Sequence, residues 1–215
     1  MIDKNLYKKP GLYDKALKFI GFERGLNNFI NRLKIDCPED CTILDLGCGT
    51  GIVGLQLIKK ISSSTLLATD IEETFLNETM KNAKERAIEK NRISVGILDI
   101  SNPTKTNLSK KLKPNSFDIV CMGGSLGYSK NQEDTLKVLS GLIKKGGYLI
   151  NIEMNENFFG KLIGSKYNYK PICLKKLVSR ISNEGFEVST IKFSIKDFPA
   201  NLTRIGIIAR RNDRK

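Results

Sequence analysis

The sequence contains neither histidine nor tryptophan among its 215 residues. Without histidine, a Ser-His-Asp or Cys-His nucleophile system cannot form, and a zinc site with imidazole ligands is excluded. No run approaches 18 consecutive apolar residues, so the sequence predicts no membrane span. The polar residues 1–10 also lack the apolar segment of a secretory leader. We therefore expect a cytoplasmic protein.

Cysteine is scarce, and its spacing is irregular. The five cysteines form no C-x-x-C pair, and their number is odd. Two of them lie four residues apart around Pro38, with no second pair that would complete a metal site. In a chain without a secretory leader, the simplest interpretation is five free thiols in a reducing compartment and no metal. These cysteines are Cys37, Cys41, Cys48, Cys121 and Cys173.

Positive charge is in surplus. Thirty-six Lys and Arg against 23 Asp and Glu give a net charge of +13. This surplus favours an acidic partner, such as a nucleic acid, an anionic lipid or a phosphorylated substrate. The alternative interpretation is that the lysines, which are scattered as single residues and doublets, only keep the surface solvated.

The apolar residues follow an alternating strand and helix pattern over one domain's length. Continuous apolar runs are typical of strands buried on both faces, so the pattern predicts an α/β, doubly wound, mostly parallel sheet. Residues 101–116 predict a short helix between loops, whereas residues 154–171 have no clear periodicity. The expected strands are 42–46, 65–69, 93–98, 117–122, 148–152, 186–195 and 203–210, and the expected helices are 12–35 (interrupted by Gly21 and Gly25), 52–61, 74–90, 132–143 and 174–184.

A glycine-rich loop, residues 45–51, follows the first expected strand and precedes a helix. In open α/β sheets ligands bind at this place, where glycine allows close backbone approach and the helix N-terminus offers free N–H groups. A dinucleotide-type G-x-G-x-x-G is also present from Gly49 to Gly54. However, Asp45 would place a negative charge beside a pyrophosphate. That carboxylate suits a ligand with an ammonium or sulfonium group better.

Two further acids end the next two expected strands. Asp70 follows the second strand and can accept hydrogen bonds from a ribose diol. Asp99, followed by Ile100, ends the third strand and can accept from an exocyclic amine of a base. Either acid alone is as well explained as a turn or cap residue. Because both acids end the two strands that follow the glycine loop, the pattern predicts a nucleoside-bearing ligand.

Residues 43–51, Ile-Leu-Asp-Leu-Gly-Cys-Gly-Thr-Gly, resemble the first motif of class I S-adenosylmethionine-dependent methyltransferases. The order of the remaining elements is similar too, over about residues 40–210. The resemblance implies a seven-stranded sheet in the order 3-2-1-4-5-7-6, with the seventh strand antiparallel and helices on both faces. It also implies S-adenosylmethionine as cofactor and S-adenosylhomocysteine as product. Within one domain, 1–215, we expect a helical cap (1–40), a cofactor-binding core (41–153), and a lid with the closing strand pair (154–215).

The resemblance also assigns positions. The glycine loop would wrap the methionine part of the cofactor above Asp45, and the two later acids would hold ribose and adenine. Tyr13 and Arg24, near the chain's start, are further candidates for contacts with the methionine end. The implied cofactor-binding residues are Asp45, Gly47, Cys48, Gly49, Gly51, Asp70, Ile71, Asp99, Ile100, Gly123 and Tyr13.

The acceptor side carries weaker signals. Residues 121–128 depart from the Asn/Asp-Pro-Pro-Tyr pattern of enzymes that methylate exocyclic or amide nitrogens. Cys121 is interpreted as a core residue, and Tyr128 is the one weak catalytic candidate, the alternative being a loop plug. Glu153 and Glu156 are interpreted as a solvated turn. The aromatic and basic residues of 154–171 predict either a substrate lid or an ordinary packed loop.

Three functions remain open. The leading hypothesis is methyl transfer to a small-molecule or lipid-type acceptor, driven by positioning and needing no histidine. The second is an RNA methyltransferase, which a basic face around residues 122–128 would favour. The third is a non-catalytic S-adenosylmethionine-binding subunit or sensor, whose sign would be the lack of an acceptor cavity.

Overall fold

Seven strands form one mixed sheet in the order β3-β2-β1-β4-β5-β7-β6. The computed structural model describes residues 8–102, 108 and 112–212. Strands β1 to β5 run parallel, and β7 pairs antiparallel with both β5 and β6. The predicted sheet order and the antiparallel seventh strand are therefore confirmed. The strands are β1 (Thr42–Leu46), β2 (Thr65–Asp70), β3 (Ile93–Ile97), β4 (Phe117–Gly123), β5 (Ile143–Met154), β6 (Phe186–Lys192) and β7 (Arg204–Arg211).

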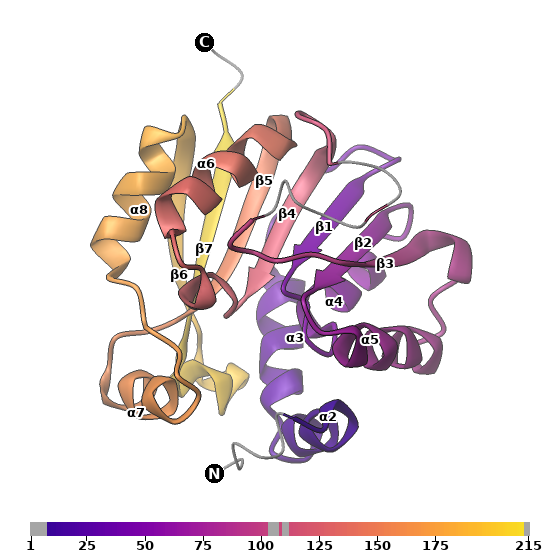
Figure 1. Cartoon of the computed structure of the whole chain (residues 1–215), viewed down its shortest axis with the longest axis vertical. Coiled ribbons are helices and arrows are strands. Elements are labelled where there is room, and N and C mark those ends of the chain that lie inside the picture. Colours follow the sequence, from indigo (N-terminus) through magenta and orange to yellow (C-terminus); the bar gives the residue numbers. More distant parts are fainter. Residues whose placement is uncertain (1–7, 103–107, 109–111, 213–215) are drawn as a thin grey trace.

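Helices cover both faces of this sheet (Figure 1). Side chains on adjacent positions of β1 enter different cores, with Ile43 on one face and Leu44 on the other. Helices α3, α4 and α5 pack on the first face, and α6 and α8 on the second. The helices are α2 (Pro10–Phe19), α3 (Phe22–Arg32), α4 (Ile52–Lys60), α5 (Glu73–Glu85), α6 (Gln132–Leu142), α7 (Phe158–Lys166) and α8 (Leu174–Asn183).

The helical pattern expected over residues 12–35 is divided into α2 and α3. Gly21 separates them with φ of +77°, a left-handed conformation that glycine adopts without strain. Gly25, the second expected interruption, is instead inside α3, because its missing side chain lets the helix contact the backbone carbonyl of Asp197. The interruption at Gly21 was predicted correctly. The interruption at Gly25 was wrong, because the glycine is required there for close packing and does not end the helix.

Two other segments differ markedly from the sequence prediction, and a third is largely untested. Strand β5 begins at Ile143, because Ile143 already pairs with Phe117 before the irregularity that follows. Residues 158–166, which have no clear periodicity, form α7. Much of the helix predicted over 101–116 falls on 103–107 and 109–111, outside the described residues. The division into cap, core and lid stays a prediction.

Cys37 and Cys41 form a disulfide. The prediction of five free thiols was therefore wrong for this pair. The turn between the two residues brings their Cα atoms to 6.0 Å, within the range that a disulfide requires. Cys48, Cys121 and Cys173 are free, and Cys121 is fully buried in the sheet, as its interpretation as a core residue predicted. None of the helices in the described part of the chain has the length and apolarity that a membrane crossing requires.

Helix α3 is held on the sheet by Phe29, which is fully buried. Its ring stacks on Phe193 with centroids 3.9 Å apart, and it lies directly over Gly206 of β7. A Cβ at Gly206 would collide with the Phe29 ring. The approach of α3 to the sheet therefore depends on glycine at this position.

We expect Gly206→Ala to lower the free energy of unfolding by about 1–3 kcal/mol, because the added methyl group overpacks the α3 contact. Gly141→Ala is the matched control, since Gly141 lies in α6 and no atom lies within 4 Å of the place that a Cβ would take there. That substitution should raise the free energy of unfolding by roughly 0.4–1 kcal/mol. Denaturant unfolding measures both; equal effects of the two substitutions would contradict the role of Gly206.

Candidate functional site

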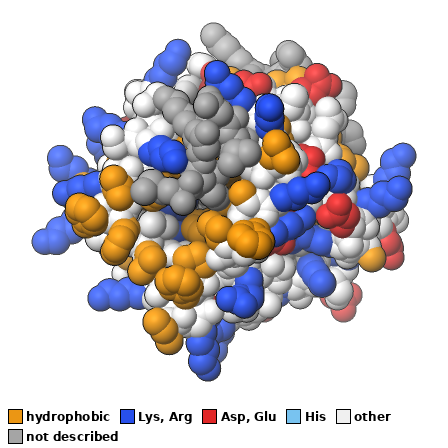
Figure 2. Space-filling model, turned by 90° about the horizontal axis from the view of Figure 1, so that it is seen from below, with side chains coloured by type: hydrophobic (Ala, Val, Ile, Leu, Met, Phe, Trp, Pro, Cys, Tyr) orange, Lys and Arg blue, Asp and Glu red, His pale blue; other side chains and the backbone are white. Residues whose placement is uncertain are grey.

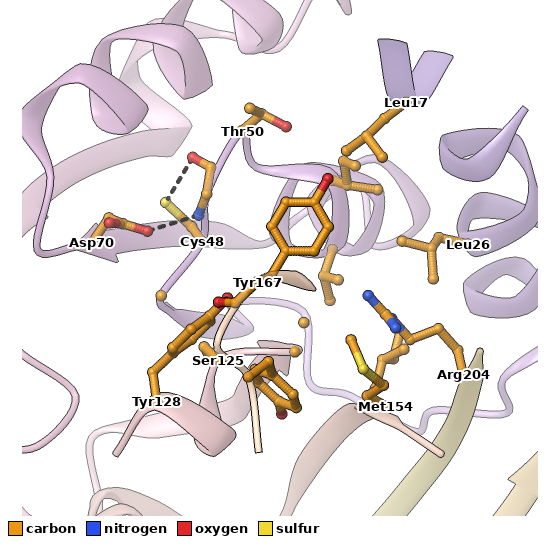
Figure 3. Close-up of a pocket in the computed structure, with 18 of the residues that line it drawn as sticks. Leu17, Leu26, Cys48, Thr50, Asp70, Ser125, Tyr128, Met154, Tyr167 and Arg204 are labelled. Atoms are coloured by element: carbon orange, nitrogen blue, oxygen red, sulfur yellow. Dashed lines mark hydrogen bonds between the residues drawn. The ribbon is translucent and has the colours of Figure 1, made fainter. Parts of the chain in front are cut away.

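A cavity of about 770 Å³ opens at the carboxyl ends of the parallel strands. Loops after β1, β2, β3 and β4 form one side, and α2, α3, α7 and the start of β7 form the other. Figure 3 shows residues from both sides pointing into it, with Asp70 and Cys48 at one end and Arg204 at the other. The cavity thus joins segments that lie far apart in the chain, from α2 to β7.

The glycine loop between β1 and α4 has three glycines with positive φ: Gly47 (+68°), Gly49 (+55°) and Gly51 (+84°). A Cβ at Gly47 would lie 2.5 Å from that of Ser125, whereas Gly49 has open space where its Cβ would be. Gly49 therefore presents bare backbone to the cavity. Cys48 anchors the loop through its N–H, which donates to the Thr69 carbonyl at 2.8 Å.

Asp45, at the end of β1, is 1% exposed and lines the cavity beneath this loop. Its Oδ2 accepts a hydrogen bond of 2.9 Å from the N–H of Gly54 in α4. Its Oδ1 is buried and has no hydrogen-bond partner within the described part of the chain. Burial raises the pKa of Asp45 to about 7, although the hydrogen bond from Gly54 opposes this shift. An unpartnered buried oxygen of this kind is a position for a cationic donor.

Asp70, at the end of β2, points toward the glycine loop (Figure 3). Its Oδ2 accepts from the Gly49 N–H at 2.9 Å, and its Oδ1 from the Glu72 N–H at 3.1 Å. Burial raises the pKa of Asp70, against the effect of these backbone donors. Each carboxylate oxygen retains a further lone pair. The residue can therefore hold the loop and still accept from a ligand.

The ends of β2 and β3 add a partly apolar surface. Ile71 is 59% exposed although it lines the cavity, and Ile100 lines it as well. Asp99 lines the cavity too, while its Oδ1 accepts from the Ser101 N–H at 2.8 Å. Its Oδ2 accepts from the Asn102 side chain at 3.3 Å, so the interpretation of Asp99 as a turn residue is correct at both oxygens. The structure brings it to the same cavity as Asp45 and Asp70.

The remaining predicted positions divide between the cavity and the surface. Gly123, at the end of β4, lines the cavity, as does Tyr13 of α2. Burial raises the pKa of Tyr13 above its ordinary value. Arg24 is exposed and does not line the cavity. All of the predicted cofactor-binding residues except Gly51 line it directly, and Gly51 forms the N-cap of α4 behind them.

Four tyrosines, Tyr13, Tyr128, Tyr167 and Tyr169, line the cavity opposite the glycine loop. Tyr169 accepts from the Gly127 N–H at 3.1 Å and donates to Glu153. Its ring packs edge-on against Tyr128, with centroids 5.0 Å apart. Tyr128, the catalytic candidate, is 43% exposed and donates to the Tyr167 carbonyl at 3.4 Å. Tyr128, Tyr167 and Tyr169 thus form one connected wall, whereas the ring of Tyr13 packs edge-on against Phe75 of α5.

Glu153 corrects an expectation from the sequence. It is 1% exposed, not part of a solvated turn, because β5 extends to Met154 and carries the residue into the interior. Its carboxyl accepts from Tyr169, from the Met154 N–H at 2.8 Å and from Asn151 at 3.3 Å. Burial raises the pKa of Glu153. Glu156 is exposed, as predicted.

Sequence reasoning missed Arg204, the first residue of β7, which lines the cavity. Its strand neighbour is Met154 of β5, also a lining residue. No local pattern marks either residue, because they meet the glycine loop only through the sheet order. The basic doublets of the sequence lie at other positions, and Arg204 is not part of one. The lining contains just two cations within the described residues, Lys130 and Arg204, against the four acids Asp45, Asp70, Glu72 and Asp99.

Exposed apolar side chains surround the mouth of the cavity. Figure 2 shows hydrophobic side chains gathered on this face, with lysines and arginines around them. Such a concentration of exposed apolar area is typical of a surface that meets an apolar ligand or partner. Of the exposed large apolar residues, Ile20, Ile71, Tyr128, Phe159 and Leu162 line the cavity, and Phe19, Phe158 and Phe198 adjoin lining residues in sequence.

Residues 38–199 match the family model described as a methyltransferase domain. A putative methyltransferase of Methanocaldococcus jannaschii is 26% identical over 164 residues, 76% of this chain and 59% of that protein. The ribosomal RNA small subunit methyltransferase C of Haemophilus influenzae is 29% identical over 84 residues, 39% of this chain and 24% of that protein. The chain thus spans less than two thirds of the length of either relative.

Solved structures share the fold at low sequence identity. A chain in the complex between the Haloferax volcanii Trm112 methyltransferase activator and the putative methyltransferase has a TM-score of 0.74 and 12% identity, covering 100% of this chain and 99% of that one. The geranyl diphosphate C-methyltransferase of Streptomyces coelicolor A3(2), in complex with Mg²⁺, geranyl diphosphate and S-adenosylhomocysteine, has a TM-score of 0.68 and 13% identity, covering 88% and 79%. The family model covers three quarters of the chain, and the sheet has the order of that family. The chain therefore belongs to the class I S-adenosylmethionine-dependent methyltransferases.

Proposed function

We propose that this chain binds S-adenosylmethionine in the cavity and transfers its methyl group to an apolar small-molecule or lipid-type acceptor. The observation that carries the cofactor assignment is the buried, unpartnered Oδ1 of Asp45 beneath the glycine loop. A carboxylate oxygen in this position is matched by the ammonium of a methionine moiety. A pyrophosphate would meet repulsion there instead.

The other predicted positions fit the rest of the cofactor. The bare backbone at Gly49 and the close turn at Gly47 leave room for the methionine chain, with Cys48 and Gly51 holding the loop's shape. Asp70 would accept from the ribose hydroxyls through its remaining lone pairs. At the adenine end, Ile71 and Ile100 would contact the ring and Asp99 its amine, while Gly123 and Tyr13 would border the methionine end.

When bound, S-adenosylmethionine supplies an electrophilic methyl group on a sulfonium. The protein's part is to align the acceptor with it, which the lining of a cavity of this size can do. Burial raises the pKa of Tyr128, so its hydroxyl stays protonated at neutral pH. We assign Tyr128 to positioning the acceptor by contact and hydrogen bonding, and not to removing a proton.

The character of the acceptor follows from the lining and the rim. An RNA-binding mouth would be basic, to neutralise phosphates. The described lining instead has more acids than cations, and its rim is apolar and aromatic, with the lysines and arginines of this face around that rim. These features support a small-molecule or lipid-type acceptor over RNA. The open space also argues against a non-catalytic sensor, which needs no acceptor cavity.

We expect S-adenosylhomocysteine to bind the parent protein and Asp70→Asn to weaken that binding roughly ten- to hundredfold. The substitution replaces a charged acceptor by an amide whose nitrogen faces donors, and a hydrogen bond to a charged group contributes about 1.5–3 kcal/mol. Isothermal titration calorimetry measures both affinities. No binding heat from the parent protein would reject the cofactor assignment.

The control for this substitution is Asp118→Asn. Asp118 is also a partly buried acid on the sheet, but it lies at the start of β4 and holds Thr42 and Lys144. Its replacement should lower stability and leave the affinity for S-adenosylhomocysteine unchanged. If both variants lost affinity equally, the effect of Asp70 would be on folding and not on ligand contact.

Proton release on binding tests Asp45 separately. With its pKa near 7, Asp45 is mostly protonated at pH 6 in the free protein. A ligand ammonium favours the carboxylate and lowers this pKa, so binding at pH 6 should release close to one proton. At pH 8 the carboxyl is already ionised, and the release should vanish. Calorimetry in buffers of different ionisation enthalpy counts the protons; Asp45→Asn should abolish the release at pH 6, and a release that persists in this variant would exclude Asp45 as its source.

A further inference from the structure

Arg204 places a positive charge inside the cavity, at the carboxyl end of β4. Its side chain starts from β7 and extends toward Gly124, so that Nη2 lies 3.8 Å from the position a Cβ there would take. Figure 3 shows the guanidinium pointing into the cavity between Leu26 and Met154. Gly124 directly follows Gly123, the residue expected to border the reactive end of the cofactor. The guanidinium thus faces the place where an acceptor must sit.

The guanidinium has no ionic partner within the described part of the chain. Its contacts are a hydrogen bond of 3.3 Å from Nη1 to the Thr203 carbonyl and the face of the Phe22 ring at 5.2 Å. Arg32 pairs with Asp197 and Arg86 with Glu23. The half-buried Arg92 has no carboxylate either, but its guanidinium donates to the backbone carbonyls of Ser64, Ile58 and Ile61. Arg204 has neither a carboxylate nor such a set of carbonyls within the described residues.

Glu153 is a candidate counterion, because the charge of Arg204 acts on its carboxyl, but other groups already donate to that carboxyl. Tyr169, the Met154 N–H and Asn151 donate to its two oxygens, and no ion pair joins it to Arg204. Burial raises the pKa of Glu153, which disfavours its charged form. The positive charge of Arg204 therefore remains available to a ligand.

The surroundings of Arg204 define the rest of that ligand. Phe22, Leu26 and Met154 lie around the guanidinium, and Tyr167 faces it across the cavity. Toward the mouth, the cavity continues between the exposed apolar side chains of α7 and α2. A guanidinium binds carboxylate and phosphate groups through paired hydrogen bonds, and an apolar channel binds a hydrocarbon body.

We propose that Arg204 binds an anionic group, a carboxylate or a phosphate, of a methyl acceptor whose body is apolar. This inference rests on the proposed function and specifies its acceptor class. A second cation strengthens it, since the cofactor's sulfonium adds positive charge to the same cavity and an anion between the two charges is stabilised by both. Methyl transfer converts the sulfonium into a neutral thioether. The cavity then attracts the anionic group of the methylated product less strongly.

The test uses three probes that share an octyl-length hydrocarbon chain and differ in their polar group: octanoate, monooctyl phosphate and 1-octanol. Each is titrated by calorimetry into the full chain saturated with S-adenosylhomocysteine. We expect at least one anion to bind about tenfold or more tightly than the alcohol, the difference a charge-assisted hydrogen-bond pair makes. Arg204→Met should abolish this preference and keep the alcohol's affinity, whereas Arg204→Lys should retain part of it. The two anions tell carboxylate from phosphate recognition.

Arg210→Met is the matched control, because Arg210 lies on the same strand and packs on Tyr148 away from the cavity. It should leave every affinity within twofold of the parent. Equal binding of octanoate, octyl phosphate and octanol to the parent, no binding of either anion, or an anion preference that survives Arg204→Met would overturn the inference. A tenfold loss of S-adenosylhomocysteine affinity in Arg204→Met would also overturn it, by assigning the arginine to the cofactor's carboxylate.

The two proposals fail in different ways. Lack of S-adenosylhomocysteine binding by the parent protein rejects the proposed function, and the probes titrated into the ligand-free chain then still report whether Arg204 selects anions. Normal cofactor binding without anion preference rejects only the acceptor class. Thermal unfolding of every variant, compared with the parent, separates loss of binding from loss of folding.

Discussion

The close turn of the glycine loop is the constraint on which the rest of the site depends. Between the end of β1 and the start of α4 the backbone is left-handed at Gly47, Gly49 and Gly51. Only glycine adopts this conformation freely, and at Gly47 only glycine also fits against Ser125. Because the loop turns so sharply, its bare backbone faces the cavity instead of covering it. The acids at the ends of β1 and β2 then border the same space.

Asp45 and Asp70 connect this loop to the electrostatics of the site. Each carboxylate accepts a hydrogen bond from a backbone N–H, Asp45 from Gly54 and Asp70 from Gly49. Both carboxyls are buried, and burial raises both pKa values. Two buried acids held this way favour a ligand that brings a positive charge or hydroxyl donors to them. The two carboxyl groups therefore both hold the local backbone and border the space that a ligand would occupy.

The opposite side of the cavity has a different chemical character. A wall of tyrosines, an apolar rim and a single arginine face the loop across the space. The Tyr169 hydroxyl, bound to Glu153 and to the Gly127 backbone, ties the loop after β4 to β5 and to the segment after α7. This connection keeps the end of β4 at a defined position relative to the rest of the wall. This side of the cavity therefore combines residues of α2 and α3, near the start of the chain, with residues of α7 and β7, near its end.

The sequence by itself determined the sheet order through its resemblance to a known family, and the glycine loop and its two acids from local spacing. The loop and the acids can be predicted from the sequence because they depend on neighbours in the chain. Glycine occurs where φ is positive, and an acid occurs where a strand ends. Only the tertiary structure decided that Glu153 is buried, that Cys37 and Cys41 are joined, and that Arg204 reaches the cavity. In each of these cases the deciding factor is a distance or an enclosure set by folding, through the extent of β5, the turn at Pro38 or the antiparallel pairing of β5 with β7. No local pattern carries that information, because burial and charge compensation depend on residues that meet only after the sheet is assembled.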